Sequence, residues 1–126
     1  MSRYRFKNMN PEGKKVDDCT VRTLSLVSGL EWDRVYDDLC DIGKWLRVMP
    51  STNEAWNSWL ELHHWKMHEV AGRPDDYNVN DFCVEHPRGA YVLGLRNHVV
   101  AVIDGHYYDT WDCGERPVLF YWTLEV

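Results

Sequence analysis

The sequence has no long apolar run and no surplus of basic residues, and these two absences narrow the classes of function it can serve. No stretch approaches the roughly 18–20 consecutive apolar residues that are needed to span a bilayer. The formal net charge is −6 at pH 7, whereas binding to nucleic acid or to anionic lipid requires clustered Lys and Arg. The basic residues between Arg3 and Lys15 are interpreted as a solvated face. We therefore expect no nucleic acid and no membrane among the partners.

The N-terminal segment also lacks the apolar core of a secretory signal peptide, and the cysteines lack C-x-x-C spacing. The four cysteines are scattered along the chain: Cys19, Cys40, Cys83 and Cys113. In a chain without a signal peptide such thiols are expected to be reduced. We therefore predict a cytoplasmic protein with free thiols, one of which is available as a nucleophile.

Three histidines lie close together in the sequence, at His63, His64 and His68, and raise the question of a metal site. The chain has no His-Glu-x-x-His helix pattern, and acidic or cysteine partners at ligand spacing are missing near these histidines. The sequence therefore predicts neither a metal nor any other cofactor.

Composition and patterning predict one α+β domain over residues 1–126. Apolar residues make up 44% of the chain, which allows a single core, and no internal repeat is found. Residues 1–16 are expected to be irregular. Helical patterns come first and β patterns follow, joined by short turns, which is typical of helices packed on a C-terminal antiparallel meander. The expected helices are residues 19–28, an apolar stripe from 32 to 42, a third helix after 51 and a short one around 82–83, and the expected strands are 65–70, 90–95, 98–103, 106–111 and 118–125.

Capping signals mark where individual helices begin and end. Asp17 or Asp18 is expected to cap the first helix, and Gly29 stands where a C-terminal glycine is favoured. Ser51 and Glu54 have the spacing of a capping box, which predicts the start of the third helix.

The clearest local signal is an Asp104-Gly105 pair between two β patterns, which predicts a hairpin with a two-residue type I′ turn. Because side chains alternate along a strand, His98 and Asp109 are then expected on one face, within reach of each other. The register predicted by this turn pairs Ile103 with His106, Val100 with Asp109 and His98 with Trp111.

A histidine held by a carboxylate on the next strand is suited to acid–base work, because the carboxylate fixes the imidazole tautomer and raises its basicity. Cys19 offers the nucleophile that such a pair requires. It occupies the first turn of the expected helix, where free backbone N–H groups and the helix dipole favour a thiolate. Each residue alone is more often structural, and the order Cys19, His98, Asp109 on these elements is what favours catalysis.

This order of a cysteine at a helix start, a histidine on a strand and an acid on the next strand resembles the papain-like cysteine peptidases. The compact members of that superfamily, such as the leader-processing peptidases of bacteriocin exporters, are similar in layout. The resemblance implies a papain-like fold and attack by the Cys19 thiolate on an amide or ester carbonyl, with an acyl-enzyme intermediate. It implies that His98 is base and acid and that Asp109 orients the imidazole.

Two features depart from the papain-like pattern. Those peptidases usually supply a glutamine to the oxyanion hole, and this sequence contains no glutamine, so Asn10 is the candidate substitute, with Asn8 also open. Asp17 and Asp18 directly precede Cys19, and carboxylates there oppose thiolate formation unless they are occupied.

The sequence therefore predicts a cysteine hydrolase that cleaves a peptide or related amide, with a peptide or protein as its substrate. A deamidase or acyltransferase would use the same three residues. The alternative from a different class is a non-catalytic module that retains the fold and binds a protein or peptide in an aromatic-lined groove. Asp112 is a rival acid, but strand alternation places it opposite to His98.

Overall fold

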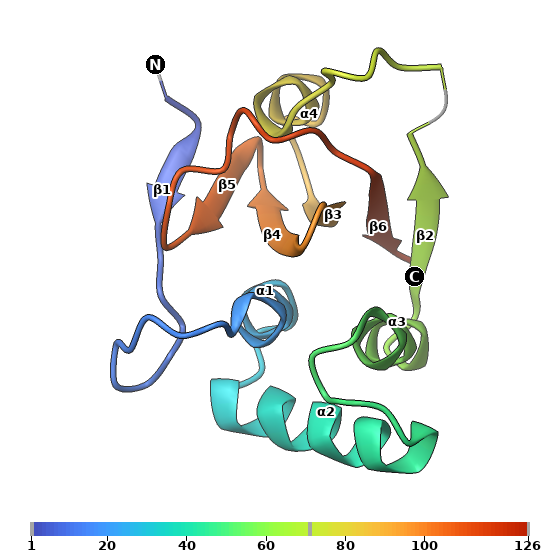
Figure 1. Ribbon diagram of the computed structural model, residues 1–126. Coiled ribbons are helices and arrows are strands. Elements are labelled where there is room, and N and C mark those ends of the chain that lie inside the picture. Colours follow the sequence, from blue (N-terminus) through green and yellow to red (C-terminus); the bar gives the residue numbers. More distant parts are fainter. Residues whose placement is uncertain (1, 71, 126) are drawn as a thin grey trace.

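The computed structural model describes residues 2–70 and 72–125 (Figure 1). Residues 1, 71 and 126, and with them the two ends of the domain predicted over 1–126, lie outside the described residues. In chain order the elements are β1 (Tyr4–Phe6), α1 (Cys19–Ser28), α2 (Trp32–Leu46), α3 (Asn53–Leu62), β2 (Trp65–Glu69), α4 (Val79–Glu85), β3 (Ala90–Leu95), β4 (His98–Ile103), β5 (His106–Asp109) and β6 (Phe120–Leu124). The α+β class is confirmed.

The six strands form one mixed sheet in the order β1-β5-β4-β3-β6-β2. β3, β4 and β5 follow one another as an antiparallel meander, as expected. The prediction of a purely C-terminal antiparallel sheet is wrong in two respects. β6 returns beside β3 instead of β5, and β1 adds a parallel strand at the far edge, from the segment that was expected to be irregular. Three residues are too few to show a strand period, so β1 has no local signal.

Helix ends follow local capping chemistry, with one shift. Gly29 ends α1 in the left-handed conformation, and Asn78 and Asp81 form a capping box at the start of α4. The predicted capping box of Ser51 and Glu54 is wrong by one residue. Thr52 caps α3, because its hydroxyl accepts from the Ala55 N–H at 3.3 Å and donates to the Met49 carbonyl at 2.8 Å.

Two hydrophobic clusters lie on the two sides of the sheet. Figure 1 shows α1, α2 and α3 on one side and α4 on the other. Val99 packs in the cluster with α1–α3, and the next residue, Val100, packs in the cluster with α4. β4 is thus covered on both faces, which explains its continuous apolar run. Within the described ranges no helix has the length and apolarity to cross a membrane.

Candidate active site

The β4–β5 hairpin has the predicted turn. Asp104 and Gly105 adopt φ values of 50° and 78°, and Ile103 pairs with His106. The Asp104 carboxylate also accepts the Gly89 N–H at 2.9 Å, which ties the turn to the segment before β3. β5 ends at Asp109, two residues short of the predicted end.

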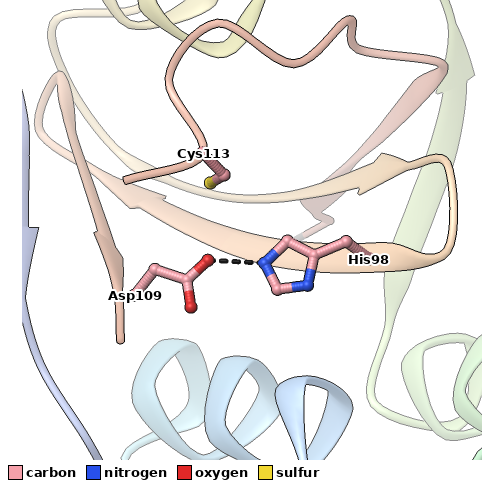
Figure 2. Close-up of side chains that lie close together, drawn as sticks. All are labelled: His98, Asp109 and Cys113. Carbon is pink, nitrogen blue, oxygen red and sulfur yellow. Dashed lines mark hydrogen bonds and ion pairs between the residues drawn. The ribbon is translucent and has the colours of Figure 1, made fainter. Parts of the chain in front are cut away.

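The hairpin brings His98 and Asp109 into direct contact. The Nε2 atom of His98 lies 2.5 Å from Oδ2 of Asp109 (Figure 2). The second carboxylate oxygen accepts the Thr110 backbone N–H at 2.7 Å and a guanidinium N–H of Arg22 at 3.2 Å. The Trp111 ring lies against the imidazole, with 4.7 Å between the ring centroids. Asp109 is 3% exposed, so its orientation is set by these partners.

Electrostatics at this pair favours an imidazolium beside a carboxylate. Burial lowers the pKa of His98, but hydrogen bonds and charge from Asp109 and Cys19 outweigh burial and raise the pKa to about 9. Burial raises the pKa of Asp109, and the hydrogen bond and charge of His98 outweigh burial, so the net direction is downward. At neutral pH the pair is therefore ionised on both sides.

Cys19 lies on α1, across from the hairpin that carries His98 and Asp109. It is the first residue of α1 and is half-buried, and it lines two pockets, each of about 640 Å³, together with His98. Its side chain contributes, after Asp109, to the raised pKa of His98. Because Nε2 is engaged by Asp109, the other ring nitrogen, Nδ1, is the one left to face the thiol. The structure thus brings together all three predicted residues.

The N-terminus of α1 keeps free donors. Asp18 holds the N-cap position, but the prediction that its side chain caps the helix is wrong, because no cap hydrogen bond is formed. Its carboxylate accepts instead from Arg22 and from the indole N–H of Trp32, the latter at 3.0 Å. The backbone N–H of Cys19 therefore points out of the helix start without competition from a capping carboxylate.

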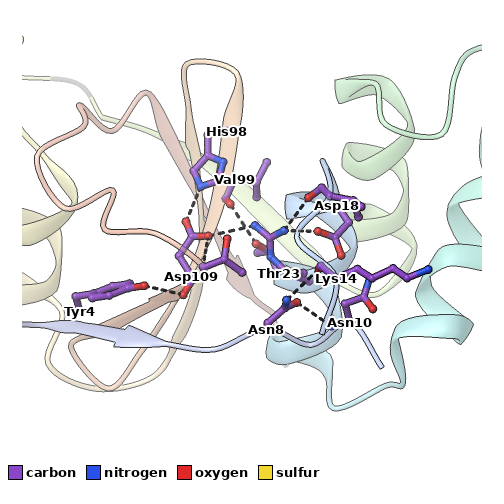
Figure 3. Close-up of polar contacts among 12 residues, drawn as sticks. Tyr4, Asn8, Asn10, Lys14, Asp18, Thr23, His98, Val99 and Asp109 are labelled. Carbon is purple, nitrogen blue, oxygen red and sulfur yellow. Dashed lines mark hydrogen bonds and ion pairs between the residues drawn. The ribbon is translucent and has the colours of Figure 1, made fainter. Parts of the chain in front are cut away.

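The structure does not bring Asn10 into the site. Its side-chain oxygen accepts the Glu12 N–H at 3.0 Å, and its carbonyl accepts the Gly13 N–H at 2.9 Å, so it closes a local turn (Figure 3). Asn8 is also committed, since it accepts from the Asn10 N–H and donates to the Lys14 carbonyl. Neither asparagine lines the pockets that contain Cys19.

Asn97 and Arg22 are two neighbours of the site that the sequence patterns did not single out. Asn97 precedes His98 in the β3–β4 turn with φ 57° and lines both pockets. Its position directly before the histidine, in a two-residue turn, was a signal that could have identified it. Arg22 lies one turn after Asp18 on α1 and contacts both Asp18 and Asp109. Its i, i+4 spacing from Asp18 predicts the first contact but not the second.

Comparisons with known proteins give no relative. No family model matches the chain, and no curated protein or solved structure does. Functional inference for this chain therefore depends on the geometry of the site.

A third side chain, Cys113, lies beside the His98–Asp109 pair, with its sulfur within 4.8 Å of their ligand atoms (Figure 2). Such a set could in principle hold a metal ion. However, two ligand atoms on a tetrahedral zinc lie about 3.3 Å apart, wider than the 2.5 Å between His98 and Asp109. Burial, and then the charge of Asp109, raise the pKa of Cys113, so its thiol stays protonated beside that carboxylate. The short contact between His98 and Asp109 therefore fits a hydrogen bond better than it fits two ligands of one metal ion.

The histidine cluster of the sequence is dispersed into separate structural contacts. His63 bonds through Nδ1 to the Trp59 carbonyl at 2.7 Å, and His68 bonds through Nε2 to the Thr123 hydroxyl at 2.7 Å. His64 has a left-handed backbone, with φ 69°, in the turn before β2. In the described part of the chain these three histidines do not form a shared ligand set.

Proposed function

We propose that this protein is a cysteine hydrolase that cleaves a peptide or related amide through Cys19, His98 and Asp109. The observation that carries the proposal is the convergence of a helix-terminal thiol and a histidine in one groove, with that histidine bonded to the buried carboxylate of Asp109. Cys19 and His98 are separated by nearly eighty residues of sequence and line the same two pockets. A nucleophile, a base and an orienting acid with these contacts are the parts that acyl transfer requires.

The first half-reaction begins from a thiolate–imidazolium pair. The Cys19 sulfur attacks the carbonyl carbon, and the C=O π electrons move to the oxygen. The backbone N–H of Cys19, at the start of α1, donates to that oxyanion. When the tetrahedral intermediate collapses, the C–N bond breaks and the His98 Nδ1 proton passes to the departing nitrogen. The products are a free amine and a thioester on Cys19.

The second half-reaction regenerates the enzyme. Neutral His98 removes a proton from water, and the resulting hydroxide attacks the thioester carbon. Collapse of this intermediate breaks the C–S bond, releasing a carboxylic acid and the Cys19 thiolate beside protonated His98. Asp109 remains a carboxylate throughout and stabilises the imidazolium at each step.

The shape of the groove supports an extended substrate. One pocket extends from Cys19 towards Trp56 and Phe120, which stack with 5.9 Å between ring centroids. The other extends towards Val16 and Trp111. The catalytic pair lies where the two pockets meet, so chain can be accommodated on both sides of the scissile bond. Aromatic walls of this kind suit a peptide with apolar side chains.

Site-resolved thiol alkylation tests the proposal. Each of the four cysteines is quantified by mass spectrometry after brief exposure to iodoacetamide. Cys40 is the matched control, because it is half-buried like Cys19 but lies within α2, far from a helix start. We expect Cys19 to react about tenfold faster than Cys40 or more, since a helix start and a neighbouring imidazolium both favour reaction of a thiol as the thiolate. The substitution His98→Ala should remove this advantage.

Equal reaction rates for Cys19 and Cys40 would contradict the enzyme and favour the non-catalytic peptide-binding module. If Cys19 does react faster, incubation of the protein with a peptide library distinguishes hydrolysis, deamidation and acyl transfer. Hydrolysis yields two shorter fragments, whereas side-chain deamidation leaves the chain length unchanged and raises the mass. Acyl transfer appears as a product joined to an added amine. Cys19→Ala is the blank for all three.

A further inference from the structure

Arg22 occupies a buried position between two carboxylates of the proposed site. It is 8% exposed, and one of its terminal nitrogens, Nη1, donates to Asp18 and to the Val16 carbonyl, the latter at 3.3 Å. The other, Nη2, donates to Oδ1 of Asp109 at 3.2 Å. Asp18 directly precedes α1 and Asp109 ends β5, and Figure 3 shows the two residues on the helix side and on the hairpin side of the site. One guanidinium therefore links the helix that carries Cys19 to the hairpin that carries its base.

The contact with Asp109 also constrains the orientation of His98. Asp109 has two oxygens in one plane, and His98 binds one while Arg22 binds the other. A carboxylate held at both oxygens cannot rotate without breaking a charge-assisted hydrogen bond. By holding the second oxygen of Asp109, Arg22 therefore fixes the direction of the bond between Asp109 and His98.

The contact with Asp18 addresses a charge conflict next to the nucleophile. Asp18 precedes Cys19 directly and is 5% exposed, so its negative charge is poorly screened and opposes a thiolate. Arg22 supplies a cation at contact distance. Cys19 lines two pockets, whose other ionisable groups, beyond His98 and Arg22, are Lys15 and Asp17 in one and Glu54 and Arg96 in the other. All four are exposed, and each pocket has one charge of each sign.

We propose that Arg22 is a positioning residue that holds the Asp109–His98 pair against α1 and offsets the Asp18 charge beside Cys19. This inference rests on the proposed function. Arg22 acts through the two carboxylates, and both of its terminal nitrogens are committed to them. Without it, Asp18 would place an uncompensated negative charge beside the developing thiolate, and Asp109 would keep only His98 as a charged partner.

The test is the pH profile of Cys19 alkylation in the full chain, with iodoacetamide as the probe. In Arg22→Gln we expect the rise in alkylation rate to occur at a pH about one unit higher than in wild type. The rate at neutral pH should then fall about tenfold. Adding Asp18→Asn to Arg22→Gln should return this rise to lower pH, because the second substitution removes the uncompensated charge nearest the sulfur.

Thr23→Val is the matched control for loss of structure. Thr23 also tethers α1 to β4, since its hydroxyl donates to the Val99 carbonyl at 3.2 Å, and it is buried but uncharged. This variant should lower the midpoint of urea unfolding and leave the pH profile in place. If Arg22→Gln fails to fold, Arg22→Lys decides the question, because a lysine keeps the positive charge but has one nitrogen where the guanidinium uses two, so the profile should move to higher pH by a smaller amount.

The two proposals fail in distinguishable ways. A wild-type Cys19 that reacts no faster than Cys40 overturns the proposed function and, with it, the role of Arg22. A reactive wild-type Cys19 whose pH profile is unchanged by both Arg22→Gln and Arg22→Lys overturns the role of Arg22 alone. A profile that moves equally in Thr23→Val would also overturn it, because the shift would then report general loosening of α1.

Discussion

Replacing His98 by glutamine removes one titrating group from the site and keeps a side chain that can donate to Asp109. The structure predicts how this change alters the pH dependence of stability. The pKa of His98 is raised from 6.5 to about 9 in the folded chain, chiefly by Asp109 and then by Cys19, against the effect of burial. The imidazolium therefore stabilises the folded state fully below pH 6.5, and this contribution is lost as the pH rises towards 9.

The size of the effect follows from linkage. A difference of about 2.5 pKa units corresponds to about 3 kcal/mol of unfolding free energy. The assay is urea unfolding followed by tryptophan fluorescence, for wild type and His98→Gln, at about pH 6 and about pH 9.5. The stability advantage of wild type over the variant should shrink by about 3 kcal/mol between these conditions. In a Cys19→Ala background the decline should be smaller and should end at a lower pH, because Asp109 alone then raises the pKa of His98.

Parallel pH dependences for wild type and His98→Gln would refute the proposed ion pair between His98 and Asp109. A wild-type advantage that grows as pH rises would refute it more strongly, because the sign would then match a histidine buried in its neutral form. An NMR titration of the His98 ring distinguishes a weak pair from a normal histidine without relying on unfolding.

Two further substitutions test details of packing and capping. Thr52→Ala should cost about 1 kcal/mol of unfolding free energy and Ser51→Ala much less, because Thr52 supplies the α3 cap. Equal losses for the two variants in urea unfolding would contradict this assignment. Gly94→Ala should cost about 1–3 kcal/mol, because its new methyl group would overlap the Phe120 ring on the neighbouring strand. Thermal unfolding measures this loss, and an unchanged midpoint would show that the ring moves aside freely.

Much of the local structure could be predicted because its causes lie within a few residues of sequence. The α1 helix has the predicted bounds, and Gly29 ends it in the left-handed conformation as expected. The hairpin register follows from Asp104-Gly105, which must take positive φ values, and the pairing of His98 with Asp109 follows from that register. These are short-range constraints of backbone geometry, and they operate before any distant contact forms.

The tertiary structure decided the remainder, because it depends on groups that are far apart in the chain. β1 becomes a strand only because β5 offers it an unpaired edge, and β6 joins β3 although β5 precedes it in sequence. Arg22 bonds to Asp109 across 87 positions, a pairing that no local period encodes. Asn10 was the predicted substitute for an oxyanion-hole glutamine, yet its side-chain oxygen accepts a hydrogen bond within its own turn. The sequence by itself identified the thiol, the imidazole and the carboxylate as candidates. Which groups surround and orient them was decided only by the packing of α1 against the hairpin, because those contacts join residues that are far apart in the chain.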